Sequence, residues 1–279
     1  MTDLDARYRA LLETTRQLGI PEGRNLVAFS GGVDSALVAH AAHAVFPESA
    51  IACLGVSGSL SAAQQRMAEV IAVHIGIPLQ LIETREAEHP GYVANEGMSC
   101  YFCKTSLYDT MSALAAAMTA ADVPFVLLNG TNADDMQDPT RVGLTAAQEF
   151  RVGSPLAAFT KQQVRELARH AGLPNWDAAA SPCLRSRLQH GVPATPANLA
   201  RVEEAEQRLR ERFAISVTED FRVRLLAGEC AMIEAGDALL AAMDLAACEA
   251  ELLPLGFARV DTRRFVSGGV SGYRPAAGA

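Results

Sequence analysis

Long apolar runs and basic clusters are both missing from this 279-residue chain. It has no stretch of 18 uncharged apolar residues, so we expect no membrane-spanning helix and no membrane partner. It also has no run of Lys and Arg, and its formal net charge is −8. An extended nucleic-acid surface is therefore not expected, whereas a local basic pocket stays open. The first residues carry acids instead of the apolar core of a secretion signal, which predicts a cytoplasmic protein.

The chain also lacks a dense cysteine framework. Its six cysteines are Cys53, Cys100, Cys103, Cys183, Cys230 and Cys248. In a reducing compartment such residues serve as thiols or metal ligands more often than as disulfides. Only one C-x-x-C pair is present, whereas structural zinc sites usually need four ligands, and a zinc site completed by His89 and His190 stays an alternative. We expect Cys53, which lies in an apolar strand, and also Cys230 and Cys248 to be structural.

What the chain does have is the hexapeptide Ser30-Gly-Gly-Val-Asp-Ser35 between an apolar run and a helical stretch. A strand, a Gly-Gly turn and a helix N-terminus together form an anion cradle, because glycine allows backbone N–H groups to point inward. The Walker A pattern and its lysine are absent. The hexapeptide resembles the PP-loop of enzymes that split ATP into AMP and pyrophosphate. We expect Ser30, Gly31, Gly32, Asp34 and Ser35 to bind ATP.

Apolar runs alternate with helical stretches through the first two thirds of the chain. Strands are predicted at 26–29, 51–56, 79–83 and 125–128, with helices near 34–46, 61–75 and 103–119. Such alternation predicts an α/β fold with a doubly wound parallel sheet. Ligands of such sheets bind beyond the carboxyl ends of the strands. The three loops found there predict further ATP contacts by Ser57, Gly130, Asn132 and Asp135, with Mg²⁺ among the expected cofactors.

The Pro- and Gly-containing segment 191–196 marks a domain boundary. We predict a PP-loop domain over 1–192 and a small α+β domain over 193–279, for substrate binding or oligomerisation. Thr195 and Pro196 are typical of a helix start, and they predict a helix over 197–212. Strand-like runs at 221–225, 230–233 and 257–261 and a helix near 237–252 complete the second domain.

Three cysteines remain once the structural ones are set aside. Cys100 and Cys103 precede a helix, and Cys183 lies in the loop Ser181-Pro-Cys-Leu-Arg-Ser-Arg187. Three cysteines can hold a [4Fe–4S] cluster and leave one iron open to another ligand. Reduced, partly buried structural cysteines are the alternative.

These motifs together resemble the LarE-type sulfurtransferases, PP-loop enzymes of nickel-pincer cofactor synthesis. The matching segments, in family order, are SGGVDS (30–35), CYFCK (100–104), NGTNADD (129–135), SPCLRSR (181–187), EEAE (203–206) and RVR (222–224). The resemblance implies that ATP adenylates a carboxylate of a pyridinium mononucleotide and that sulfur then displaces AMP. It also implies two versions of the sulfur source. In one, Cys183 gives up its own sulfur and becomes dehydroalanine. In the other, favoured by all three cysteines being present, a [4Fe–4S] cluster on Cys100, Cys103 and Cys183 carries an extra sulfide.

The remaining site residues follow from the resemblance and from the chemistry of this reaction. We predict catalytic roles for Cys183 and Asp34. Substrate contacts are predicted for Ser186, Arg187, Glu206, Arg222 and Arg224, of which the last two alternate on a strand and share a face. Arginines in this arrangement suit a nucleotide phosphate, and a solvated strand face would show the same pattern. The partners we expect are a nucleotide-like carboxylate, sulfide or another sulfur donor, and further copies of the chain.

Three other functions stay open. A PP-loop ligase that delivers ammonia would share the ATP loop, but it gives no reason for three cysteines. A tRNA thiolase would explain both sulfur and a cluster, although the sequence pI near 5.3 argues against it. A non-catalytic nucleotide-binding sensor with an iron–sulfur cluster is the third.

Overall fold

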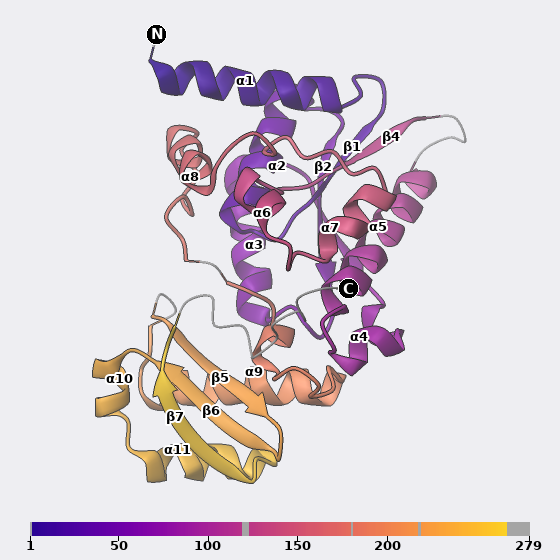
Figure 1. The fold of residues 1–279 in the computed structure, drawn as a ribbon. Helices are drawn as coiled ribbons and strands as arrows, with labels where there is room; N and C mark the ends of the chain where they lie inside the picture. Colours follow the sequence, from indigo (N-terminus) through magenta and orange to yellow (C-terminus); the bar gives the residue numbers. More distant parts are fainter. Residues whose placement is uncertain (1, 119–122, 180, 217–218, 267–279) are drawn as a thin grey trace. The chain divides into compact units, whose positions relative to one another are not determined.

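A computed structural model describes residues 2–118, 123–179, 181–216 and 219–266 (Figure 1). Contacts within the chain divide it into two compact units. Unit 1 contains Met1–Glu86 and Cys100–Ser181. Unit 2 contains Ala87–Ser99 and Pro182–Ala279. A short segment from the first half of the chain therefore packs with the C-terminal part.

Unit 1 is built on a four-stranded parallel sheet. Its strands are β1 (Arg24–Ala28), β2 (Ala50–Val56), β3 (Leu79–Glu83) and β4 (Phe125–Leu128), in the order β3-β2-β1-β4. The chain moves outward from β1 to β3 and then crosses to the other side of β1. This reversal places a topological switch point between β1 and β4, where ligands of parallel sheets usually bind.

Helices cover both faces of this sheet. On one face, α1 (Asp3–Leu18), α2 (Val33–Val45), α3 (Ala62–Ile75) and α8 (Lys161–His170) pack over a core that includes Val27 and Ala52. On the other, α5 (Ser99–Met118) and α7 (Gly143–Glu149) pack over Leu26 and Cys53. Alternate strand residues thus point into different cores, as the pleat requires. The predicted α/β fold with a doubly wound sheet is confirmed.

Several helix starts follow from local capping. Two capping boxes are present: the Ser61 hydroxyl accepts from the backbone N–H of Gln64, and that of Thr160 accepts from Gln163. In each box the glutamine side chain bonds back to the cap residue, which satisfies a second backbone donor. The box at Thr160 sets the first helical residue of α8 at Lys161.

Unit 2 contains the small second sheet, of order β5-β6-β7. Strands β5 (Phe221–Leu226) and β6 (Cys230–Ala235) are antiparallel, and β7 (Arg259–Arg264) runs parallel to β6. Helix α9 (Pro196–Arg212) packs on β5, with Thr195 as its cap as predicted.

Further short helices complete both units: α4 (Pro90–Ala94), α6 (Ala133–Gln137), α10 (Asp237–Ala242) and α11 (Leu245–Leu252), with 3-10 turns η1 (Glu86–Glu88), η2 (Leu184–Arg187) and η3 (Leu253–Leu255). The single helix predicted near 237–252 is in fact α10 and α11. The side chain of Asp244 accepts from the N–H of Ala246 and caps a new helix start there.

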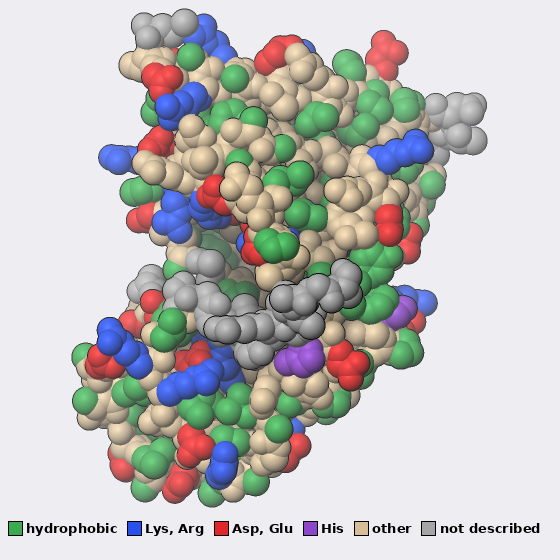
Figure 2. Space-filling model, viewed as in Figure 1, with side chains coloured by type: hydrophobic (Ala, Val, Ile, Leu, Met, Phe, Trp, Pro, Cys, Tyr) green, Lys and Arg blue, Asp and Glu red, His purple; other side chains and the backbone are tan. Residues whose placement is uncertain are grey.

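The surface carries charges of both signs. On the face shown in Figure 2, acidic and basic side chains lie in small groups beside one another. Among the helices of the described residues, none is long and apolar enough to cross a bilayer.

Candidate active site

The PP-loop joins β1 to α2 and has the geometry of an anion cradle. Gly31 has φ +72°, and a Cβ at this residue would lie 2.7 Å from the Cα of Ala68, so glycine is required on both counts. Gly32 is the N-cap of α2 and provides no side-chain acceptor for the first amides of the helix. Those N–H groups carry the positive end of the helix dipole and suit a phosphate.

Two serines hold this loop in shape. The hydroxyls of Ser30 and Ser35 lie 3.1 Å apart, and the Ser35 hydroxyl donates to the carbonyl of Gly32 at 3.0 Å. The backbone N–H of Ser30 donates to the same Ser35 oxygen. The side chain of Asn175 also donates to the carbonyl of Gly31, at 2.7 Å. The predicted loop residues are thus brought together, and Asn175 is a supporting residue that no sequence motif indicated.

The loop after β4 meets the PP-loop at the switch point. A Cβ at Gly130 would lie 2.8 Å from the backbone of Asp34 and of Ser35, so the two loops approach closely. Asn132 caps α6 with its oxygen and donates from its amide nitrogen to Asp34 Oδ1 at 3.0 Å. Asp135 completes the capping box and pairs with Arg141 at 2.6 Å. Asp34, Gly130, Asn132 and Asp135 therefore form one cluster, as their positions after neighbouring strands predicted.

Lys161 is a second cation at this cluster, besides Arg141, and the sequence motifs did not indicate it. Its ammonium forms an ion pair with Asp34 Oδ2, and its backbone N–H donates to Asp134 Oδ2 at 2.9 Å. The capping box at Thr160 fixes the position of Lys161, but the contact bridges 127 residues of sequence. A Walker A lysine lies within its loop, whereas here the lysine comes from a distant helix start.

The loop after β2 holds a second group of polar residues. The hydroxyl of Ser57 donates to Glu86 Oε1 at 2.5 Å, and that of Ser59 donates to the same oxygen at 3.3 Å. Glu86 is only 2% exposed. Ser57 was predicted to bind ATP, and Glu86 is a further residue that the motifs did not indicate.

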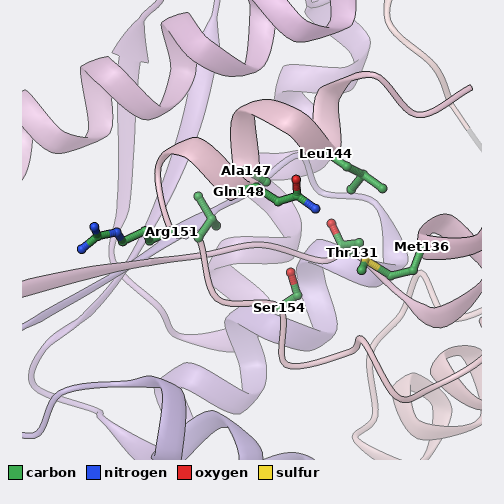
Figure 3. A pocket seen from close by; sticks show the side chains of 8 residues that line it. Thr131, Met136, Leu144, Ala147, Gln148, Arg151 and Ser154 are labelled. Atoms are coloured by element: carbon green, nitrogen blue, oxygen red, sulfur yellow. The ribbon is translucent and has the colours of Figure 1, made fainter. Parts of the chain in front are cut away.

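A cavity of about 170 Å³ adjoins the loop after β4 (Figure 3). Met136, Leu144, Ala147 and Val152 form much of its wall, and Thr131, Gln148, Arg151 and Ser154 add polar groups. The hydroxyl of Ser154 donates to the side chain of Asn129 at 2.8 Å, which ties this wall to the end of β4.

The six cysteines occupy two kinds of environment. Cys53, Cys230 and Cys248 are buried, as predicted for structural residues. Burial raises the pKa of the Cys53 thiol to about 12 and that of Cys248 to about 11, which keeps both protonated and unreactive. Cys100 is exposed, and Cys103 and Cys183 are partly exposed.

The C-x-x-C pair and Cys183 belong to different units. Cys100 and Cys103 lie in the first turns of α5 in unit 1, whereas Cys183 is in unit 2. Within the described part of the chain, no group of three or more His, Cys, Asp or Glu side chains is arranged to hold a metal ion.

The Cys183 loop is held by two buried arginines. Arg187 donates to the carbonyl of Pro182 at 2.5 Å and to Glu206 at 2.9 Å. Glu206 also accepts from the backbone N–H of Val223, which joins α9 to β5. The loop closes on itself, because the Ser186 hydroxyl donates to the Cys183 carbonyl at 2.7 Å.

Arg224 is the second arginine that holds the Cys183 loop. It donates to the carbonyl of Ser186 at 2.6 Å and pairs with Glu234 on β6 at 2.7 Å. Its neighbour on the same strand face, Arg222, stacks over the ring of Phe265 at 4.7 Å, and burial lowers the pKa of its guanidinium. The predicted substrate residues Ser186, Arg187, Glu206 and Arg224 are thus brought together around Cys183.

Comparison with known proteins gives a consistent picture, although no family model matches the chain. It is 42% identical over 201 residues to an uncharacterized protein of Synechocystis sp., covering 71% of this chain and 73% of that protein. It is 33% identical over 190 residues to the pyridinium-3,5-bisthiocarboxylic acid mononucleotide synthase of Lactiplantibacillus plantarum, covering 67% of each chain. It is also 29% identical over 174 residues to a chain of the glutamine-hydrolyzing GMP synthase of Sulfurisphaera tokodaii, covering 56% of this protein and 45% of that one.

Proposed function

Since this chain belongs to the family of the pyridinium-3,5-bisthiocarboxylic acid mononucleotide synthase, the LarE family of ATP-using PP-loop enzymes, we propose that it is an ATP-dependent sulfurtransferase. Its substrate is a carboxylate of a pyridinium mononucleotide, and its product is the thiocarboxylate. The observation that carries the proposal is the cluster of Ser30, Ser35, Asp34 and Lys161 at the N-terminus of α2, together with the relationship to the synthase.

The first step activates the carboxylate. A carboxylate oxygen attacks the α-phosphorus of ATP, and the bond from that phosphorus to the bridging oxygen of pyrophosphate breaks. The N–H groups at the start of α2 bind the negative charge of the departing pyrophosphate. AMP then becomes the leaving group of the carbonyl carbon, where an unactivated carboxylate would have to expel oxide.

The Lys161 ammonium supplies positive charge at this loop. Its ion pair with Asp34 keeps it beside the first turn of α2, and Asn132 fixes the other oxygen of Asp34. Mg²⁺ is expected to arrive with the ATP phosphates. Because the described residues offer no group of three His, Cys, Asp or Glu ligands, we assign it no protein site and no separate step.

In the second step a sulfur nucleophile attacks the carbonyl carbon, and AMP leaves. Cys183 is the proposed donor site, and the clamps from Arg187 and Arg224 hold the backbone on both sides of it. A [4Fe–4S] cluster on Cys100, Cys103 and Cys183 would supply an exchangeable sulfide and spare the protein. Cys100 and Cys103 belong to unit 1 and Cys183 to unit 2, and we derive no step from the cluster.

The test supplies the pyridinium dicarboxylate mononucleotide and ATP to protein purified without oxygen. We expect pyrophosphate release that depends on the carboxylate and a product mass in which sulfur replaces oxygen. Ammonia in place of a sulfur source should give no amide. Pyrophosphate release with amide formation, or ATP binding without turnover, would refute the proposal in favour of a ligase or a sensor.

The same preparation decides the sulfur source. Bound iron and labile sulfide in the wild type, lost in Cys100→Ala and in Cys183→Ala, would support the cluster. Iron-free protein in which Cys183 becomes dehydroalanine during turnover would support sacrifice of the cysteine. In that reaction the Cys183 Cβ–S bond breaks and its Cα proton leaves, so the mass of H₂S is lost from the chain.

A further inference from the structure

Glu86 has one carboxylate oxygen that the described residues leave without a partner. Its Oε1 accepts from the hydroxyls of Ser57 and Ser59, whereas its Oε2 is buried and accepts no hydrogen bond from the described chain. The residue as a whole is 2% exposed. A buried charged oxygen that lacks a donor costs free energy, and proteins retain such a group chiefly where a ligand or a mechanism uses it.

The position of Glu86 relates it to the ATP loop within unit 1. Ser57 follows β2, and Ser30 follows β1, its neighbour in the sheet, where Ala28 pairs with Cys53. Adjacent strands lie about 5 Å apart, so the two loops emerge side by side at the carboxyl edge of the sheet. A nucleotide whose phosphates occupy the PP-loop is long enough to reach the next strand end with its nucleoside half.

The chemistry of the Ser57–Glu86 group determines which half of the nucleotide it can bind. A carboxylate accepts hydrogen bonds and repels phosphate, so it suits neutral donors. In ATP these donors are the ribose hydroxyls and the amino group of adenine. Ser57 and Ser59 both donate to Oε1 and thereby fix the orientation of the carboxylate. Gly58 between them is exposed and adds no side chain to this loop.

We propose that Glu86, oriented by Ser57 and Ser59, is a specificity residue that accepts a hydrogen bond from the nucleoside half of ATP. This inference rests on the proposed function for the identity of the nucleotide. It adds a residue, Glu86, that accepts a hydrogen bond from a hydroxyl or amino group of that nucleotide. A site built to bond such a donor rejects an analogue without it, because the partner is then left unpaired.

The experiment measures nucleotide binding by calorimetry without the carboxylate, so that no turnover occurs. Wild type is titrated with ATP, 2′-deoxy-ATP, 3′-deoxy-ATP and the triphosphate of purine riboside, which lacks the amino group. We expect one of the three analogues to bind about 10- to 100-fold more weakly than ATP, and its identity separates ribose from base recognition. Equal binding of all four nucleotides would overturn the inference.

Two variants complete the test. Glu86→Gln should bind ATP about 10- to 100-fold more weakly and should no longer distinguish ATP from the sensitive analogue. Glu83→Gln is the matched control, because Glu83 is an exposed acid three residues earlier, and it should behave as wild type. Glu86→Gln should not lower the melting temperature of the ligand-free protein, since the substitution removes a buried charge.

The outcomes separate this inference from the proposed function. If wild type makes the thiocarboxylate and Glu86→Gln still discriminates like wild type, the inference falls and the sulfurtransferase stands. If Glu86→Gln weakens all four nucleotides by the same factor and melts earlier, Glu86 is only a structural support and the inference falls. If wild type does not bind ATP, both fall.

Discussion

The PP-loop cluster of unit 1 and the Cys183 loop of unit 2 both contain ion pairs, but the pair in the first is partly exposed and the pair in the second is buried. In the first, the side chains of Lys161 and Asp34 are 37% and 24% exposed. In the second, Arg224 and Glu234 are 2% and 4% exposed. An exposed pair can exchange one partner for a ligand phosphate at little cost, whereas opening a buried pair leaves an uncompensated charge.

This difference separates residues that bind from residues that hold a loop. Lys161 lies beside amides that have no side-chain cap, so its charge is available to a bound anion. Arg187 and Arg224 use their donors on carbonyls of the Cys183 loop and on Glu206 and Glu234. In this structure both arginines hold the Cys183 loop in place. A contact with substrate would be made in addition to these hydrogen bonds.

The largest effect is expected at Cys183. Cys183→Ala should reduce thiocarboxylate formation by about 1,000-fold or more, because it removes the sulfur donor site in either version of the chemistry. Pyrophosphate release in the first turnover should persist, since the PP-loop cluster is intact. Product mass and pyrophosphate are measured on the same samples. Loss of both signals together would contradict the division of labour between the two loops.

Breaking the buried pair should be the next largest effect. Arg224→Met leaves Glu234 paired with the exposed Arg263 and should lower the free energy of unfolding by about 3–5 kcal/mol. Arg222→Met is the matched control on the same strand, where loss of the stacking on Phe265 should cost about 1 kcal/mol. Urea unfolding gives both values. Equal losses would show that burial does not distinguish the two arginines.

Removing the charge of Lys161 should affect ATP binding more than it affects the stability of the fold. Lys161→Met should weaken ATP binding or slow pyrophosphate release by about 10- to 100-fold, with little change in melting temperature. Arg165→Met, one turn later on α8, is the control and should leave nucleotide binding unchanged. A large fall in melting temperature for Lys161→Met with normal ATP affinity would mean that this pair, too, is only structural.

The smallest effect concerns pH and the helix layer behind the PP-loop. Burial, with smaller contributions from His43 and His74, lowers the pKa of His40 below its ordinary value of 6.5. Protons therefore bind the unfolded chain more readily, so this contribution to stability is complete above pH 6.5 and is lost as the pH falls toward the folded pKa. His40→Gln should flatten the fall in urea midpoint between about pH 7.5 and about pH 5.5. A His40→Gln variant that keeps the wild-type slope would contradict this assignment.

Local patterns predicted much of unit 1. The four strands, the capping boxes at Ser61 and Thr160 and the PP-loop were readable because each depends on neighbours in sequence. The helix break at Asp244 was missed, although an Asp two residues before a donor N–H is a local signal that could have revealed it. Ser30, Asp34 and Asn132 meet because β1 and β4 are neighbours that end at one edge of a parallel sheet.

The sequence by itself determined the doubly wound sheet, the anion cradle after its first strand and the burial of Cys53, since hydrophobic period and glycine conformation act over a few residues. Only the tertiary structure decided that Lys161 pairs with Asp34, that Glu86 accepts a hydrogen bond from Ser57, and that Arg224 pairs with Glu234. Those contacts depend on how helices and strands pack, and a carboxylate or a guanidinium looks the same in sequence whether it will be buried or exposed.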